Sequence, residues 1–373
     1  VAESSIKVNA NITIDLNKMT VTGSFVTYGE VTIQNGTIDV PNGKTNYAYG
    51  KLTLADVDIT GKAASSSLLS VNYNGSVTID KDSTIVADSE QGHFPAVFIK
   101  GHDDRGKTYA PELNIYGTVQ SAKTPAIQGN GTDRGVSHVN VFEGAVVKSE
   151  TLAIYLPQPC EVNITDGLVE GYCGIGIKSG TLNISGGEIS GNRVNSTNDD
   201  LGFDGGGGVY VDLYATLDLS GTARIAGNYA CAVDYKESAT FGGGFGGGVY
   251  VAGTFNMRGG EICDNFAGLA NYKNKYGNDD RRGGDGGGVY LYSKSDFSMS
   301  GGSIQDNTVD DRGGGVFVRG YDHTITLSGR SIIQNNVDKD NQDNNLYLEN
   351  SSQQVSARRL SSGADIGISS GRT

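Results

Sequence analysis

A short stretch that recurs along the chain predicts the fold: Phe255-Asn256-Met257-Arg258-Gly259-Gly260-Glu261-Ile262. Its pattern is apolar-x-apolar-x-Gly-x-x-apolar, and close copies begin at Leu182 and Phe297. Degenerate copies begin at nine further positions: Ile12, Val31, Leu52, Val77, Leu113, Val139, Val162, Leu217 and Ile325. The shortest separation between successive copies is 19 residues. The repeating unit therefore needs about 20 residues and grows by insertion.

Each copy combines alternation of period two in very short segments with Gly or Asn at the bends, and helical periodicity is missing. Three short strands and three bends use about 20 residues, which is one coil of a solenoid whose coils pair about 4.8 Å apart. Strand crossovers of this kind are right-handed. The sequence therefore predicts an all-β fold, a single-stranded right-handed parallel β-helix of about twelve coils with loop insertions on one edge.

The copies follow one another from Ile12 to Ile333 without a linker. We therefore expect residues 1–373 to form one β-helix domain. The chain opens with Val1-Ala2-Glu3 directly before alternating sequence, without the pattern of a signal peptide. This opening suggests a piece of a longer exported protein.

Composition and charge exclude several classes of protein. The chain has 56 glycines but only 6 prolines, and its longest apolar runs have four or five residues, which excludes a transmembrane helix. The net charge of −13 argues against nucleic acid or anionic lipid as the main partner, because phosphate binding needs clustered Lys and Arg. We expect a monomer without nucleic-acid partner or membrane insertion, whose ligands are neutral or cationic.

Motifs for metal, redox or phosphate chemistry are missing from the sequence. The cysteines Cys160, Cys173, Cys231 and Cys263 lack Cys-x-x-Cys spacing, so we expect buried free thiols or one disulfide and no metal site. The glycine triplets precede strands instead of helices, which removes the interpretation of a phosphate cradle.

An asparagine falls at the same point of five successive units: Asn192, Asn228, Asn265, Asn307 and Asn335. Asn tolerates the left-handed conformation that a tight bend requires. Stacked amides also form hydrogen-bonded ladders. We therefore expect these residues to form a structural ladder at one corner of the coils.

The second half contains a more specific motif, Gly246-Gly247-Gly248-Val249-Tyr250-Val251, with equivalents from Gly206, Gly286 and Gly313. Each is followed by a segment of the type SGG-x-I-x-x-N. Over about residues 150–370 the chain resembles the GGGVYV/SGGTISGN repeat regions of large surface proteins from gut Firmicutes. The resemblance implies a right-handed parallel β-helix, export and an extracellular position at the cell surface. It implies little about chemistry, because the same fold carries polysaccharide lyases and glycosidases.

Three long insertions occupy one slot, at residues 193–205, 229–245 and 266–285. Because coils stack, insertions at one slot lie side by side on one edge. Aromatic rings interleaved with charged groups are typical of carbohydrate sites, although such loops can also be tolerated surface loops. The ligand-binding residues predicted here and on the strands beside them are Phe203, Asp204, Tyr210, Tyr235, Phe241, Phe245, Tyr250, Tyr272, Tyr276, Arg281, Arg282, Asp285 and Tyr290.

The first strands of the units carry a column of residues whose neighbours are apolar on both sides. Alternation predicts that this column points away from the bore. Its members are Phe98, Gln128, Tyr155, Gly176, Tyr210, Tyr250, Tyr290, Phe317 and Tyr347. We expect an exposed aromatic stack from Tyr210 to Phe317, which serves either as scaffold or as a platform for glycans.

Acidic residues near the insertion slot offer a catalytic alternative. Coil spacing places Asp285 on the order of 5 Å from Asp311 and on the order of 10 Å from Asp204. These separations are near those of the carboxylate pairs in glycosidases, which are about 5 to 9.5 Å. The competing interpretation is that these are solvated corner acids, paired in part with Arg312.

A second cluster of charged residues lies on two early loops. It comprises His102, Asp103, Asp104, Arg105, Lys107, Asp133, Arg134 and His138. A lyase would use such acids to bind Ca²⁺ and a Lys or Arg as base. The alternative is a pair of loops joined by salt bridges.

Two functions remain open from the sequence. The first is a surface module that binds glycans or host proteins through the edge of insertion loops, without a cofactor. The second is a carbohydrate-active enzyme, a glycoside hydrolase or polysaccharide lyase, that uses acids on the same edge or in the His102 cluster, with Ca²⁺ only in the case of a lyase. An enzyme needs two acids that converge on a sugar-sized gap, whereas a binding module does not.

Overall fold

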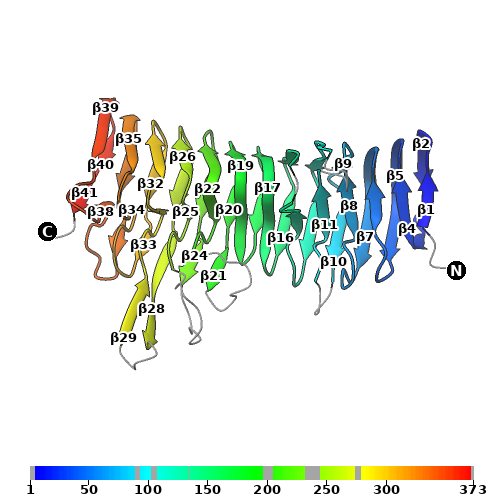
Figure 1. Cartoon of the computed structure of the whole chain (residues 1–373), viewed down its shortest axis with the longest axis horizontal. Coiled ribbons are helices and arrows are strands. Elements are labelled where there is room, and N and C mark those ends of the chain that lie inside the picture. Colours follow the sequence, from blue (N-terminus) through cyan, green and yellow to red (C-terminus); the bar gives the residue numbers. More distant parts are fainter. Residues whose placement is uncertain are drawn as a thin grey trace. The chain divides into compact units, whose positions relative to one another are not determined.

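The computed structural model describes residues 5–88, 93–101, 107–132, 134–195, 205–231, 244–273 and 279–370. All regular structure in these residues is β-strand, and none of them belongs to a helix that could span a membrane (Figure 1). Contacts divide the chain into two compact units. Unit 1 comprises Val1–Gly171 and Ile175–Leu182, and unit 2 comprises Tyr172–Gly174 and Asn183–Thr373.

Unit 1 is built from three columns of parallel strands, one strand of each column per coil. The first column is β1 (Ser5–Val8), β4 (Ser24–Thr27), β6 (Asn46–Ala48), β8 (Leu69–Asn72), β11 (Val97–Lys100), β14 (Ile127–Gly129) and β17 (Leu152–Ile164). The second is β2 (Ile12–Asp15), β5 (Glu30–Val40), β7 (Lys51–Gly61), β9 (Ser76–Ile79), β12 (Glu112–Ile115), β15 (Ser137–Val141) and the end of β17. The third is β3 (Thr20–Thr22), the ends of β5 and β7, β10 (Thr84–Ala87), β13 (Thr118–Ser121), β16 (Val146–Ser149) and β18 (Leu168–Glu170).

Unit 2 repeats this arrangement. Its first column is β22 (Val209–Leu219), β25 (Val249–Val251), β30 (Val289–Leu291), β34 (Val316–Val318), β38 (Leu346–Leu348) and β41 (Ile368–Ser370). The second is the end of β22, β26 (Thr254–Met257), β31 (Asp296–Met299), β35 (Thr324–Gly329) and β39 (Val355–Leu360). The third is β20 (Glu188–Ser190), β23 (Arg224–Ala226), β27 (Glu261–Cys263), β32 (Ser303–Gln305), β36 (Ile332–Gln334) and β40 (Asp365–Ile366). Strand β19 (Cys173–Ile184) has residues in both units.

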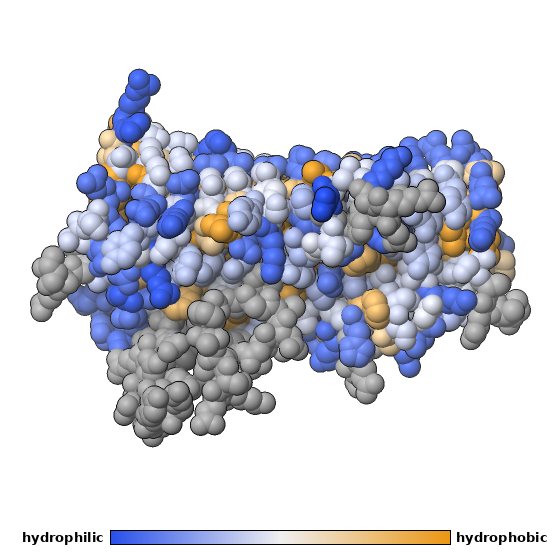
Figure 2. All heavy atoms as spheres, viewed as in Figure 1, coloured by the Kyte–Doolittle hydropathy of each residue, from blue (hydrophilic) through white to orange (hydrophobic). Residues whose placement is uncertain are grey.

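The predicted parallel β-helix is confirmed, and so is the register of the repeats within each unit. Val31 pairs with Leu52, Leu52 with Val77, and the series continues through Leu113, Val139 and Val162. In unit 2, Leu217 pairs with Phe255, which pairs with Phe297. These side chains are buried. The first apolar position of these repeats therefore fills the bore, while hydrophilic residues predominate on the surface seen in Figure 2.

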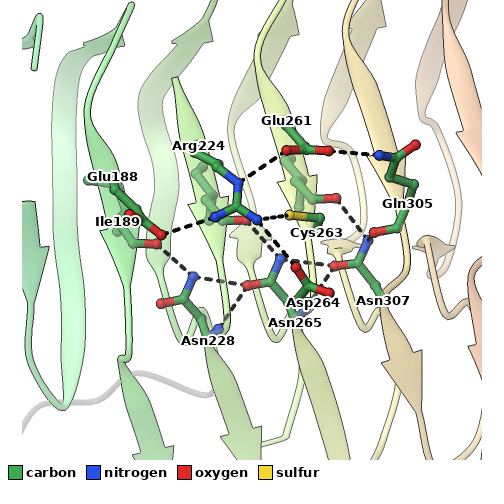
Figure 3. A network of polar contacts seen from close by, with 12 residues as sticks. Glu188, Ile189, Arg224, Asn228, Glu261, Cys263, Asp264, Asn265, Gln305 and Asn307 are labelled. Atoms are coloured by element: carbon green, nitrogen blue, oxygen red, sulfur yellow. Dashed lines mark hydrogen bonds and ion pairs between the residues drawn. The ribbon is translucent and has the colours of Figure 1, made fainter. Parts of the chain in front are cut away.

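A ladder of buried asparagines joins the coils of unit 2. Asn265 Oδ1 accepts hydrogen bonds from the backbone nitrogen and from Nδ2 of Asn228, at 3.0 and 2.9 Å. Asn265 in turn donates from the same two nitrogens to Asn307 Oδ1, and its Nδ2 also donates to Ile225 O (Figure 3). The same pattern joins Asn192 to Asn228, Asn307 to Asn336, and Asn336 to Asn345.

Two details of the asparagine prediction are wrong. The ladder member in the last predicted unit is the buried Asn336, whereas Asn335 is exposed. The left-handed conformation belongs to the residue before each ladder asparagine from Asn192 to Asn336, such as Asp264 with φ 56° and Asn335 with φ 55°. At the first four predicted positions the bend therefore lies one residue earlier than predicted, whereas Asn335 adopts the predicted conformation. The ladder asparagine is selected for its amide instead of for its backbone.

The glycine triplets are coupled to this ladder. Gly286 adopts φ 72°, in the region that glycine favours. A Cβ on Gly288 would lie 2.7 Å from the Gly315 carbonyl oxygen and 3.0 Å from Asn307 Nδ2. The third glycine of the triplet therefore has no room for a side chain, because the coil backbone passes directly over the amide.

The insertions begin as a fourth column of parallel strands: β21 (Arg193–Asn195), β24 (Tyr229–Cys231), β28 (Phe266–Lys273), β33 (Thr308–Val309) and β37 (Val337–Asp338). Their side-by-side placement at one slot is confirmed for these residues. However, Val194, Ala230 and Ala267 are buried. The first residues of these insertions therefore belong to the core.

The four cysteines are buried free thiols. Cys160 Sγ donates to Ser179 O at 3.2 Å, and burial raises the pKa of this thiol to about 12. A thiol with such a pKa is almost fully protonated at neutral pH and is a poor nucleophile. The structure thus gives the cysteines a packing role.

Replacing Asn265 with Leu removes the two hydrogen bonds that its Oδ1 accepts from Asn228 and the two that its Nδ2 donates, to Asn307 Oδ1 and to Ile225 O. We expect the free energy of unfolding to fall by about 2–4 kcal/mol, because buried polar groups of Asn228, Ile225 and Asn307 each lose a hydrogen-bond partner. Chemical denaturation of the variant measures this loss. Asn256→Leu on the outward face of β26 is the matched control, and equal stability losses in the two variants would contradict the structural role of the ladder.

Candidate functional site

A row of residues immediately before the glycine triplets connects four successive coils of unit 2. Gly205 bridges to Phe245, Phe245 to Asp285, and Asp285 to Arg312, each in parallel. Three of these residues end the insertions at the predicted slot. The row therefore brings an aromatic ring, a carboxylate and a guanidinium into neighbouring coils at one edge.

The buried Asp285 forms a bidentate ion pair with the partly exposed Arg312. Arg312 Nε donates to Asp285 Oδ1 and Nη2 donates to Oδ2, both at 3.0 Å. Only 6% of the Asp285 side chain is exposed. Burial raises the pKa of Asp285 to about 7, although the charge and hydrogen bonds of Arg312 act in the opposite direction.

Arg312 also contacts further acids and rings. Its Nε lies 3.4 Å from Asp311 Oδ2, and its Nη1 lies 3.6 Å from Glu349 Oε1. The guanidinium lies over the Phe317 ring at 4.7 Å and over the Tyr347 ring at 6.0 Å. About a third of the Arg312 side chain remains exposed. We call Asp285, Asp311, Arg312 and Glu349 the Arg312 cluster.

The aromatic column of unit 2 stacks as predicted. Centroid distances are 4.9 Å for Tyr210 and Tyr250, 5.2 Å for Tyr250 and Tyr290, 5.5 Å for Tyr290 and Phe317, and 5.8 Å for Phe317 and Tyr347. The expected exposure is wrong, because Tyr250, Tyr290 and Phe317 are buried. Phe245 packs against this column from the insertion edge, and Arg312 lies over it. A column that points away from the bore has thus become a second small core.

A second arginine crosses the same column. Arg319 Nη1 donates to the hydroxyl of Tyr290 at 2.9 Å. Its guanidinium lies 5.9 Å from the Phe245 ring centroid and 5.8 Å from that of Tyr292. Burial raises the pKa of Tyr290, so its hydroxyl stays protonated.

Several predicted site residues lie outside the described residues: Phe203, Asp204, Tyr235, Phe241 and Tyr276. Tyr272, Arg281 and Arg282 lie on an antiparallel hairpin formed by β28 and β29 (Asp279–Gly283). In this hairpin, Tyr272 pairs with Asp280 and Asn271 pairs with Arg281. The hairpin extends the fourth column at the predicted edge.

The His102 cluster is described only in part, because residues 102–106 and 133 lie outside the described ranges. Lys107 lies over the ring of Tyr109 at 5.3 Å. His138 Nδ1 lies 3.4 Å from Glu161 Oε2. Within the described ranges, no group of three His, Cys, Asp or Glu residues is arranged to hold a metal ion.

Sequence reasoning missed a polar network on the third column of unit 2. Arg224 contacts Glu188, Glu261, Cys263 and Asp264 at 3.0–3.3 Å (Figure 3). Gln305 extends the network to the next coil by donating to Glu261 Oε1 at 2.7 Å. The sequence could have revealed this network, because residues at the same position of equivalent strands lie beside one another in neighbouring coils, as Glu188, Arg224 and Glu261 do.

Sequence reasoning also missed an aromatic stack in unit 1. Tyr28 and Tyr49 lie 5.1 Å apart, Tyr49 and Tyr73 5.3 Å, and Tyr73 and Tyr109 4.8 Å, with Tyr47 beside Tyr49 at 6.1 Å. The first two follow strands of the first column and precede a glycine. This repeated Tyr-Gly step at the end of successive strands was the signal that could have revealed the stack.

Comparisons with known proteins return no match, whether to a family model, to a curated protein or to a solved structure. The interpretation of the site therefore rests on its geometry.

The raised pKa of Asp285 has a consequence for stability. Between a pH of about 4 and a pH of about 7, the folded protein holds a proton at Asp285 that the unfolded chain has released. The stabilisation from this proton is present in full below pH of about 4 and is lost as pH rises to about 7.

The parent protein and Asp285→Asn should therefore differ in how stability depends on pH. We expect the parent to lose stability relative to the variant by on the order of a few kcal/mol as pH rises from about 4 to about 7.5. Denaturant titrations at several pH values measure this difference. A difference that is constant across the range would show that the pKa of Asp285 is not raised.

Proposed function

We propose that this protein is a bacterial cell-surface β-helix module that binds glycans at the insertion edge of unit 2. The observation that carries the proposal is the Arg312 cluster at the base of the insertions. A partly exposed guanidinium there lies between the exposed Asp311 and the half-buried Glu349, and the rings of Phe317 and Tyr347 lie beneath it. Charged groups that are held in place by one another present fixed donors and acceptors to sugar hydroxyls.

The edge also supplies apolar surface next to these polar groups. Tyr292 is exposed and lies beside Arg319, which in turn lies beside Phe245. Glycans bind to protein surfaces that combine aromatic area with a few oriented polar groups. The hairpin of β28 and β29 continues the same edge with Tyr272, Arg281 and Arg282.

Catalysis is the second candidate, and one observation favours it. A carboxyl group with a pKa near 7 is suited to act as a general acid, and Asp285 has such a pKa. Against this, both Asp285 oxygens accept hydrogen bonds from Arg312 and the side chain is almost inaccessible. Asp285 would reach a glycosidic oxygen only if Arg312 moved away, so binding without turnover is the better supported function.

The position at the cell surface is part of the proposal and is supported by the resemblance of the glycine triplets and SGG segments to bacterial surface repeats. Host surface proteins are alternative partners for the same edge. The charge of −13 favours neutral or cationic ligands over nucleic acid.

A shortened hairpin tests the proposed site. Leu269 and Gly283 are paired across the hairpin, so a two-residue Asn-Gly turn can replace residues 270–282 and leave the buried Ala267 in place. On a glycan array, we expect the parent protein to bind and the shortened variant to lose at least tenfold in affinity. The thermal unfolding midpoint should stay close to that of the parent, because the described core is intact.

Tyr214→Ala is the matched control. Tyr214 is 79% exposed, and it follows the first-column segment of β22, whereas the insertion edge precedes that segment. Product analysis on every bound glycan separates binding from turnover. Parental affinity in the shortened variant would exclude the hairpin from the site, and released sugar products that disappear in Asp285→Asn would favour the enzyme.

A further inference from the structure

The tyrosine stack of unit 1 lies on the surface. It comprises Tyr47 within β6, Tyr28, Tyr49 and Tyr73 at the corner that follows β4, β6 and β8, and Tyr109 from the coil beyond. We call these residues the tyrosine ladder. Tyr28 is 50% exposed and Tyr47 is 36% exposed. Contiguous exposed aromatic surface on a protein commonly marks a binding site.

The aromatic column of unit 2 provides an internal comparison. Its central residues Tyr290 and Phe317 are completely buried, and Phe at one position serves as well as Tyr at the next. Such a column stabilises the parallel sheet and nothing more is needed to explain it. In the tyrosine ladder every member is a tyrosine, and the rings remain partly or largely exposed. A scaffold role explains the stacking but leaves the hydroxyls without a purpose.

Four of the five hydroxyl groups of the ladder are available to a ligand. Within the part of the chain that the structure describes, the hydroxyls of Tyr28, Tyr49 and Tyr73 make no hydrogen bond, and the same is true of Tyr47. Tyr28 and Tyr49 stack nearly parallel, at 8°, so each ring covers a face of the other. What these rings offer to solvent is therefore a row of edges and hydroxyl groups, not open faces.

The surroundings of the ladder carry balanced charge. The strands that follow the corner begin with Glu30 and Lys51, whose side chains form an ion pair at 2.7 Å. One coil further, Ser76 donates to Glu112 at 2.8 Å. Lys107 lies over the Tyr109 ring at the end of the ladder. Because these charges are paired, the surface does not attract a polyanion or a polycation. It suits a neutral ligand with many hydroxyl groups.

We propose that the tyrosine ladder binds a neutral, extended polysaccharide whose chain runs along the ladder, one sugar per coil. Neighbouring rings are spaced by 4.8–5.3 Å, which is close to the advance per sugar in an extended β-1,4-linked chain. Each hydroxyl can donate to or accept from a sugar hydroxyl at its own coil. Tyrosine supplies this contact with little loss of side-chain entropy.

Binding along a ladder depends on ligand length. One rung contributes little by itself, but each further rung engages a sugar that is already held close by its neighbours. Affinity should therefore rise with each added sugar until the ladder is covered. This site is separate from the insertion edge of unit 2 and does not depend on the function proposed for that edge.

The test measures binding of β-1,4-linked gluco-, xylo- and manno-oligosaccharides, two to six sugars long, to the full chain by calorimetry. We expect at least one series to gain tenfold or more in affinity from two to five sugars. In the triple variant Tyr28→Phe, Tyr49→Phe and Tyr73→Phe, we expect this affinity to fall at least tenfold. The melting curve should not change, because the rings and their stacking are kept.

Tyr214→Phe in unit 2 is the matched control and should bind like the parent. The shortened-hairpin variant should also retain oligosaccharide binding, which separates this inference from the proposed function of unit 2. The inference is overturned if none of the three series binds, if affinity does not depend on length, or if the triple variant binds like the parent.

Discussion

Backbone pairing between equivalent strands of successive coils is the interaction on which the rest of each unit depends. It fixes the neighbours of every side chain, because a residue lies beside its counterparts one coil earlier and one coil later. A residue type that recurs at one position of successive coils therefore forms a continuous row of side chains. This constraint produces three kinds of row. They are the asparagine ladder of hydrogen-bonded amides, the aromatic column of buried rings and the tyrosine ladder of partly exposed rings.

Much of the fold was predictable because the repeat spacing reflects this pairing directly. The starts of the repeats pair with one another in the structure, as do Tyr210, Tyr250 and Tyr290 in the first column. Period-two alternation reports which side chains enter the bore, but it does not report what covers the side chains that leave it. Tyr290 is hydrogen-bonded by Arg319, which follows the paired strand of the next coil and is 29 residues away in sequence, and no local pattern contains that contact.

The candidate site was less predictable for the same reason. The sequence placed Asp285 and Asp311 in neighbouring coils, but the bidentate contact of Arg312 with Asp285 is a matter of side-chain geometry. Asn335 and Asn336 are adjacent residues of one type, and only the position of the left-handed bend decides which amide enters the ladder. In unit 1, the repetition of tyrosine before glycine marks the stacked corner, but it belongs to no bore-facing alternation and to no charged motif.

The asparagine ladder has a direction. From Asn228 to Asn345 each Oδ1 accepts from the preceding ladder asparagine, and from Asn192 to Asn336 each Nδ2 donates to the next one. The amide dipoles of the ladder therefore point the same way and polarise one another. A coil that carries both the glycine triplet and the asparagine presents an amide acceptor to the coil before it and an amide donor to the coil after it. Such a coil is interchangeable with its neighbours, so duplication or loss of one whole repeat in the gene would lengthen or shorten unit 2 without creating a mismatched junction. The array can thus evolve by gain or loss of whole repeats, whereas an inserted segment of any other length must project from the coil as a loop.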